Sequence, residues 1–105
     1  MVDKSIIDTA IRYVKLIPAE LEVKKAFLFG SYAKGLAKDD SDIDIAIVIE
    51  NMTDFFSTQT QLMRARRSVD LRIEPHPIDE ADFTNNNPFA FEILKNGVEI
   101  LVDVN

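Results

Sequence analysis

Residues 42–49, with the sequence DIDIAIVI, place an isoleucine at every second position. Because successive side chains of a β-strand point to opposite faces, this spacing predicts a strand with one face made of isoleucine. Past Asp44 the other face, with Ala46 and Val48, is apolar as well. A strand that is apolar on both faces lies inside a sheet and needs secondary structure on both sides of that sheet.

Three segments carry apolar residues at helical spacing between start and stop signals. These segments are residues 5–17, 53–67 and 88–96. The residues placed to cap them are Ser5, Thr53 and Asn87. Pro18 and Gly97 follow the first and third segments, and Pro88 opens the third, as is typical of helix boundaries. Phe55, Leu62 and Met63 of the second segment are expected in the core, and residues 32–41 are predicted to be a short helix and a loop.

Three more strands are predicted from apolar runs and turn residues. They are residues 25–30, ended by Gly30, residues 68–75 and residues 98–104. In residues 68–75 apolar side chains alternate with Asp70, Arg72 and Glu74, and two prolines mark the end of the strand. We therefore expect one α+β (or α/β) domain over residues 1–105, with a small mixed sheet of about four strands flanked by helices.

The composition excludes several kinds of site. The chain has no cysteine and one histidine, which rules out a disulfide framework and a zinc site built from thiolates or several histidines. Only carboxylates remain to hold a metal, and they favour hard cations such as Mg²⁺ or Mn²⁺. No apolar run approaches the roughly 20 residues that cross a bilayer, and the first residues do not resemble a signal peptide, so we expect no membrane association and a cytoplasmic location.

A formal net charge of −6 disfavours binding along a nucleic-acid backbone, because such a chain repels phosphate. One basic cluster exists, RARR at residues 64–67, with Arg72 shortly after it. We favour the interpretation that these arginines complement the dipole at the end of the second predicted helix. The alternative is that one or two of them face a phosphate or an acidic partner.

Asp42 and Asp44 open the central strand on the same face, about 6.5–7 Å apart along the backbone. Their carboxylates can converge on one hard cation. A third carboxylate from a neighbouring strand would allow two ions about 4 Å apart, the arrangement used in phosphoryl transfer. Asp70 is the first candidate and Glu74 the second. His76, between two prolines, is expected in a loop, with a place lining the site as the less favoured alternative.

Gly30 and Ser31 follow the predicted strand 25–30 directly. Glycine at a strand end allows a tight turn and lets backbone N–H groups approach an anion. The serine hydroxyl can donate to a phosphate oxygen, while Asp42 and Asp44 hold a cation that bridges the same phosphates. These residues therefore predict a triphosphate-binding site.

Gly30-Ser31, residues 32–41 and then Asp42-Ile43-Asp44 resemble the signature of the DNA polymerase β-like nucleotidyltransferase superfamily. The segments GSYAKG and SDIDIAIV are similar to its minimal nucleotidyltransferase (MNT) branch, of the MntA-like antitoxin type. The resemblance continues through VDLRIE, where the family carries its third carboxylate, and NPFAFEILKNGVEIL, which is similar to the family's last helix and strand. It therefore covers most of the chain and implies the polymerase β-like nucleotidyltransferase fold.

This resemblance implies the activity and the role of each matching residue. Asp42, Asp44 and Asp70 would bind the metal ions and act in catalysis, with Asp70 also helping to activate the acceptor, and Gly30 and Ser31 would hold the triphosphate. A hydroxyl would attack the α-phosphate of a nucleotide, most often ATP, and pyrophosphate would leave. Proteins of this kind commonly pair with a small helical HEPN-type protein, often as the antitoxin of its toxin, and some adenylylate that partner.

We favour an Mg²⁺-dependent nucleotidyltransferase of the protein adenylyltransferase type. The main alternative is a noncatalytic protein that keeps the fold and neutralises its partner by contact. Transfer to a small molecule or to RNA is a weaker alternative, since no appended domain would hold a small acceptor and the acidity disfavours RNA. Self-association through an edge strand is compatible with all three.

Overall fold

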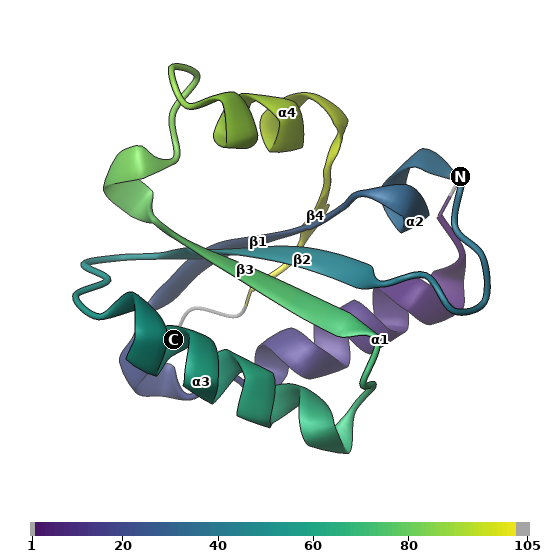
Figure 1. Cartoon of the computed structure of the whole chain (residues 1–105), viewed down its shortest axis with the longest axis horizontal. Helices are drawn as coiled ribbons and strands as arrows, with labels where there is room; N and C mark the ends of the chain where they lie inside the picture. The colour runs from purple at the N-terminus through teal and green to yellow at the C-terminus, as the bar shows by residue number, and fades with distance from the viewer. Residues whose placement is uncertain (1, 103–105) are drawn as a thin grey trace.

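Four strands form one mixed sheet in the computed structural model, which describes residues 2–102 (Figure 1). They are β1 (Val23–Phe29), β2 (Ile43–Ile49), β3 (Ile73–Asp79) and β4 (Val98–Ile100). The order across the sheet is β3-β2-β1-β4, with β1 antiparallel to β2 and β4, and β2 parallel to β3. The predicted α+β fold with a mixed sheet is confirmed, and β2 lies inside the sheet as its apolar faces required.

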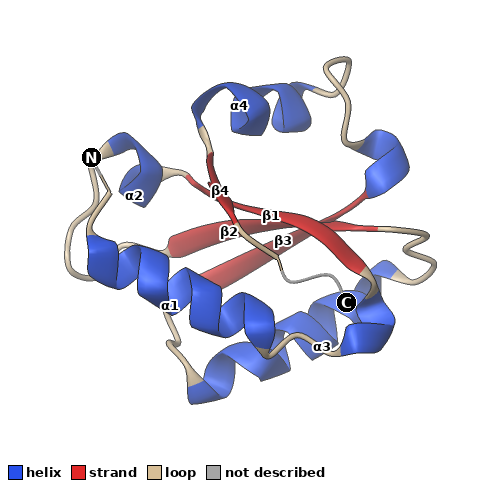
Figure 2. Cartoon of the chain, turned by 180° about the vertical axis from the view of Figure 1, so that it is seen from behind, coloured by secondary structure: helices blue, strands red, loops and turns tan. Residues whose placement is uncertain are grey.

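Helices cover both faces of this sheet, as the two views from opposite sides show (Figures 1 and 2). α1 (Lys4–Lys15) and α3 (Phe55–Ala65) lie on one face, and α4 (Pro88–Asn96) lies on the other. A helix of four residues, α2 (Ser31–Lys34), follows β1 directly. Three 3₁₀ turns, at Ala19–Leu21, Arg66–Ser68 and Glu80–Asp82, complete the elements of the described chain.

The alternation in β2 divides the core into two parts. Its four isoleucines are buried against α1, α3 and the facing side chains of β1 and β3. Ala46 and Val48 point to the opposite face, where they pack with Phe27, Ile78 and Ile93 of α4. The first cluster is the larger, because two helices rather than one close that face.

Two helix starts differ from the prediction by one or two residues. The cap of α1 is Asp3, whose carboxylate accepts from the Ser5 N–H, and not Ser5 itself. The cap of α3 is Asp54, which accepts from the Ser57 N–H, and not Thr53. In both cases an aspartate has the extended backbone that lets its side chain reach the free N–H groups of the first turn. Asn87 caps α4 as predicted.

β3 begins five residues later than the predicted strand 68–75 and contains both prolines. Residues 66–72 instead form a 3₁₀ turn and a bend, and Asp70 lies there rather than in the strand. Pro75 and Pro77 are tolerated because β3 is an edge strand. The carbonyl groups of Ile73 and Pro75 accept from Arg66 and Gln59, away from β2. Every second residue of β3, from Ile73 onward, therefore directs its backbone groups away from β2. Both prolines are at such positions, where a missing N–H costs no hydrogen bond of the sheet.

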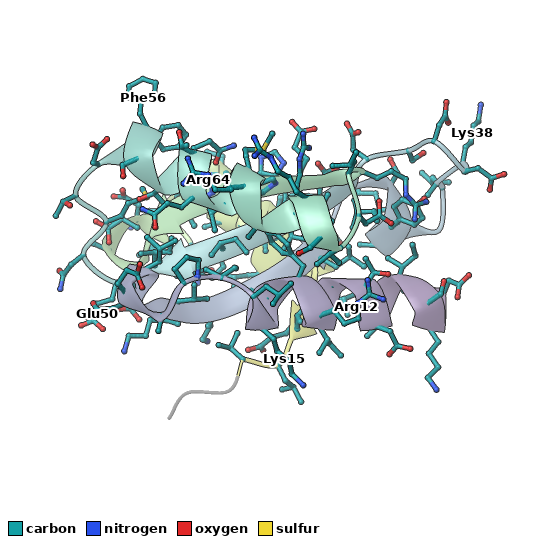
Figure 3. The ribbon with its side chains drawn as sticks, turned by 90° about the horizontal axis from the view of Figure 1, so that it is seen from below. Arg12, Lys15, Lys38, Glu50, Phe56 and Arg64 are labelled. Atoms are coloured by element: carbon teal, nitrogen blue, oxygen red, sulfur yellow. The ribbon has the colours of Figure 1, made fainter. Side chains whose placement is uncertain are left out.

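The expectations for Phe55 and for the last strand are corrected. Phe55 is half exposed rather than buried, and its neighbour Phe56 projects away from the body of the protein at the start of α3 (Figure 3). β4 is shorter than the predicted strand 98–104, whose last two residues are outside the described range. Within residues 2–102, no helix combines the length and the apolar character needed to cross a membrane.

Candidate active site

Asp44 and Gly30 meet where β1 ends beside the start of β2. Phe29, the last residue of β1, pairs with Asp44, the second residue of β2. The next residue, Gly30, has φ 76° and ψ −150°, a conformation almost confined to glycine. A Cβ on Gly30 would collide with Asp44 Oδ2. The glycine is therefore required both by its backbone conformation and by the carboxylate against it.

Asp42 and Ser31 flank this contact. Asp42 is exposed and directly precedes β2, so it lies outside the strand that was predicted to include it. Ser31 is the first residue of α2 and is half-buried. With only four residues, α2 contributes little dipole, so an anion at this turn would depend on individual donor groups.

The ring of His76 binds the other oxygen of Asp44. His76 Nε2 is 3.0 Å from Asp44 Oδ1. The histidine side chain is 33% exposed and the aspartate side chain 22% exposed, so the pair lines an accessible site. The ring packs edge-on against Phe29 at 5.0 Å and lies 6.1 Å from Phe89 of α4. His76 is therefore held by contacts from β1, β2 and α4.

The side chain next to Asp44 across the sheet belongs to Glu74. The two residues are partners in the parallel register of β2 and β3, and paired residues project from the same face of a sheet. Glu74 is exposed. Of the two predicted candidates for a third carboxylate, the structure thus brings Glu74 beside Asp44 in the sheet.

The carboxylate of Asp70 is bound by an arginine. Arg72 donates from Nε to Oδ1 at 3.1 Å and from Nη2 to Oδ2 at 2.8 Å, and its backbone N–H also donates to Oδ1. These hydrogen bonds, with the arginine's positive charge, lower the pKa of Asp70, and the same pairing raises the pKa of Arg72. The fork is bidentate, so both oxygens of Asp70 are already engaged.

Arg72 also braces the loop that leads to Asp42. Its Nη1 donates to the Tyr32 hydroxyl at 3.0 Å and to the Asp39 carbonyl at 3.1 Å. Tyr32 in turn donates to the Lys38 carbonyl. The Asp70–Arg72 pair therefore connects the turn before β3 with α2 and with the loop between α2 and β2.

The residues at this site fit a hard cation. Asp44 Oδ2 lies against the Gly30 turn, so a phosphate bound there would be repelled unless a cation lay between the two anions. Asp42, Asp44 and Glu74 supply oxygen donors of the kind that Mg²⁺ and Mn²⁺ prefer. Among residues 2–102, no three acidic or histidine side chains already converge closely enough to hold a metal.

Sequence reasoning gave the place of His76 beside the site only as the less favoured alternative, and it missed the role of Arg66. Both prolines suggested that the strand ends before His76, whereas its placement two residues after Glu74 is the signal that could have put both on one face. In the basic cluster, Arg66 Nη1 donates to the Ile73 carbonyl of β3 at 2.9 Å, a role that neither interpretation had included. Arg64 lies on the outer surface of α3 (Figure 3).

The chain is similar in sequence to a known protein family and in fold to several solved structures. The family model described as "Polymerase beta, Nucleotidyltransferase" matches residues 12–103. A putative nucleotidyltransferase from Sulfolobus solfataricus, solved as a crystal structure, has a TM-score of 0.66 and 21% identity, with 91% of this chain and 79% of that chain covered. No curated protein matches the chain significantly.

Two more solved structures share the fold. A toxin–antitoxin crystal structure with AMP-PNP has a TM-score of 0.66 and 19% identity, and a mutant of the toxin–antitoxin MntA–HpeT has a TM-score of 0.62 and 19% identity. In both, 92% of this chain and 73% of the other chain are covered. At these identities the likeness concerns the fold.

Proposed function

Because the chain belongs to the polymerase beta nucleotidyltransferase family, we propose that it transfers AMP from ATP to a hydroxyl group of a partner protein. The observation that carries this proposal is the contact between Gly30 and Asp44. It places a glycine turn able to approach phosphate directly beside a carboxylate able to hold a cation.

The reaction forms one phosphorus–oxygen bond and breaks another. The acceptor oxygen attacks the α-phosphorus of ATP, the bond from that phosphorus to the oxygen bridging to the β-phosphate breaks, and pyrophosphate leaves. Gly30 and Ser31 bind the triphosphate, and the hydroxyl proton passes to a site carboxylate. Bound Mg²⁺ or Mn²⁺ would neutralise negative charge on the phosphates and on the pyrophosphate that leaves. Asp42 and Asp44 are the residues that would hold it.

The hydrogen bonds of the two candidates favour Glu74 as the third carboxylate. Asp70, the residue predicted first, has both oxygens engaged by Arg72, whereas Glu74 is exposed and is the register partner of Asp44. We therefore place Glu74 with Asp42 and Asp44 at the metal, and Asp70 in the brace of the loop. Glu74→Gln should abolish transfer while leaving the fold intact. If Asp70 is the ligand instead, Asp70→Asn should abolish transfer while Glu74→Gln leaves it unchanged.

The acceptor is proposed to be a small helical HEPN-type protein for which this chain is the antitoxin. Two of the structures that share its fold are described as toxin–antitoxin pairs, one of them with AMP-PNP, and the sequence motif resembles the antitoxin type of minimal nucleotidyltransferase. The alternative is neutralisation by contact alone.

The decisive experiment incubates the purified protein with α-labelled ATP, Mg²⁺ and either host lysate or the product of the neighbouring gene. The test variant is Asp42→Asn with Asp44→Asn. The matched control is Asp39→Asn with Asp40→Asn, which removes the same charge from exposed residues of the same loop. We expect label on the partner with the wild type and the control, and none with the test variant.

One result would leave the noncatalytic alternative in place. It is the absence of transfer with the partner present, together with the absence of Mg²⁺-ATP binding by calorimetry. Label that appears equally with the double variant of Asp42 and Asp44 would instead show transfer at another site.

A further inference from the structure

We propose that His76 is a positioning residue, which donates a hydrogen bond from Nε2 to Asp44 Oδ1 and fixes that carboxylate for its cation. The inference deepens the proposed function and rests on Asp44 as a metal ligand. It starts from the distance of 3.0 Å between His76 Nε2 and Asp44 Oδ1. A carboxylate that binds a metal is commonly held by a further hydrogen bond that orients it.

The two oxygens of Asp44 are restrained from opposite sides. Oδ1 faces His76 Nε2, and Oδ2 occupies the space that a Cβ atom on residue 30 would need. Rotation of the carboxylate would break the contact with His76. The side chain is therefore preorganised before any ion binds, which lowers the entropy that binding costs.

The histidine ring is itself held in place by aromatic neighbours. It packs edge-on against Phe29 at an interplanar angle of 66° and lies 6.1 Å from Phe89, while those two rings lie 5.4 Å apart. Phe29 precedes Gly30 directly, and Phe89 lies in the first turn of α4. The aromatic group sets the ring orientation, so the hydrogen bond to Asp44 has a fixed direction.

The contrast with Asp70 shows why an imidazole suits this role. Asp70 is paired with a guanidinium, which is always charged and cancels the carboxylate charge. An imidazole can donate a hydrogen bond as a neutral group. Asp44 can thus be oriented by His76 and still keep its full negative charge for a cation.

The test separates the hydrogen bond from the packing with two variants. His76→Phe keeps an aromatic ring between Phe29 and Phe89 but has no donor. His76→Gln loses the ring but places an amide donor near the position of Nε2. Mn²⁺ affinity, measured by electron paramagnetic resonance without nucleotide, should fall about 10- to 100-fold in His76→Phe and recover at least in part in His76→Gln. Thermal unfolding of each variant checks that it is folded.

A second measurement needs neither metal nor activity. His76 is the only histidine of the chain, so its imidazole nitrogens give unambiguous ¹⁵N signals. In the neutral ring, whose two nitrogens have distinct ¹⁵N shifts, we expect the proton on Nε2. A neutral ring protonated on Nδ1 would overturn the proposal, because Nε2 could not donate to Asp44.

The outcomes distinguish this inference from the proposed function. Equal Mn²⁺ affinity in the wild type and a folded His76→Phe would overturn the role of His76 and leave the nucleotidyltransferase proposal standing. Lower affinity in both His76 variants, without recovery in His76→Gln, would mean that the ring acts by packing alone and would also overturn it. Absence of Mn²⁺ binding in the wild type both without nucleotide and with ATP present would overturn both proposals.

Discussion

At the residue scale, two glycines with positive φ have different reasons to be glycine. Gly30 has φ 76° and ψ −150°, and a Cβ there would collide with Asp44. Gly35 has φ 73° and ψ 21°, and no atom lies within 4 Å of the position of its Cβ. Gly35→Ala should cost about 1–2 kcal/mol of the free energy of unfolding, from backbone strain alone. Gly30→Ala should cost more and should also remove Mg²⁺-ATP binding.

Chemical denaturation and calorimetry of the two variants measure these effects, and Gly35→Ala serves as the control for backbone strain. Equal losses of stability, with nucleotide binding kept in both, would mean that the contact between Gly30 and Asp44 has no role in the site.

Asp70 makes stability depend on pH in a defined direction. Its folded-state pKa lies below the ordinary value of 3.8, chiefly because Arg72 donates hydrogen bonds to its carboxylate. The pair therefore stabilises the fold fully above pH 3.8, and this contribution is lost as the pH falls through the lower folded-state pKa. At pH 7 Asp70→Asn should be less stable than the wild type by about 1–2 kcal/mol. The difference should begin to shrink below pH 3.8. Urea unfolding that gives the same difference at pH 7 and well below pH 3.8 would contradict this.

At the scale of the element, β3 is an edge strand whose outward backbone is covered by side chains of the segment before it. Gln59 of α3 donates to the Pro75 carbonyl, and Arg66 donates to the Ile73 carbonyl. Together with the missing N–H groups of the two prolines, these contacts leave little of the edge free to pair with another chain. Arg66, one of the clustered arginines, thus helps to protect the edge of β3.

Arg66→Met should therefore lower the free energy of unfolding by about 1–3 kcal/mol, because it removes a charged donor from a part-buried carbonyl. The adjacent Arg67 is exposed, and Arg67→Met should change stability by less than about 0.5 kcal/mol. Urea unfolding of the two variants makes the comparison. If both variants lose the same amount, general charge and not the hydrogen bond to β3 is responsible.

At the scale of the whole molecule, the two faces of the sheet are closed to different extents. α1 and α3 cover the isoleucine face, while α4 alone covers the smaller cluster on the face that carries Asp44. Hydrogen exchange should therefore show α4 opening locally, with protection about tenfold or more below that of α1 and β2. Equal protection in α4 and α1 would mean that the domain opens only as a unit. Because Phe89 contacts His76, we expect added Mg²⁺-ATP to raise the protection of α4.

Elements whose signals are local could be predicted from the amino-acid sequence alone. The alternation of β2, the turn at Gly30 and the cap at Asn87 each depend on a few neighbouring residues, and the motif from Gly30 to Asp44 placed the site at the junction of two elements. Caps shifted by one or two residues because aspartate and a nearby serine or threonine both suit that position.

Three features could be read from the folded chain and not from local patterns: the sheet edge that tolerates proline, the carboxylate beside Asp44, and the direction of the His76 side chain. Pro75 and Pro77 end a strand by propensity, yet they fit the outward-facing positions of β3 because no further strand pairs there. Because β3 begins at Ile73 and continues through both prolines, Glu74 and His76 lie on the same face as Asp44. Asp70 lies before the strand, where it pairs with Arg72. These choices depend on register and strand order, which join residues about thirty positions apart in sequence and which no local pattern contains.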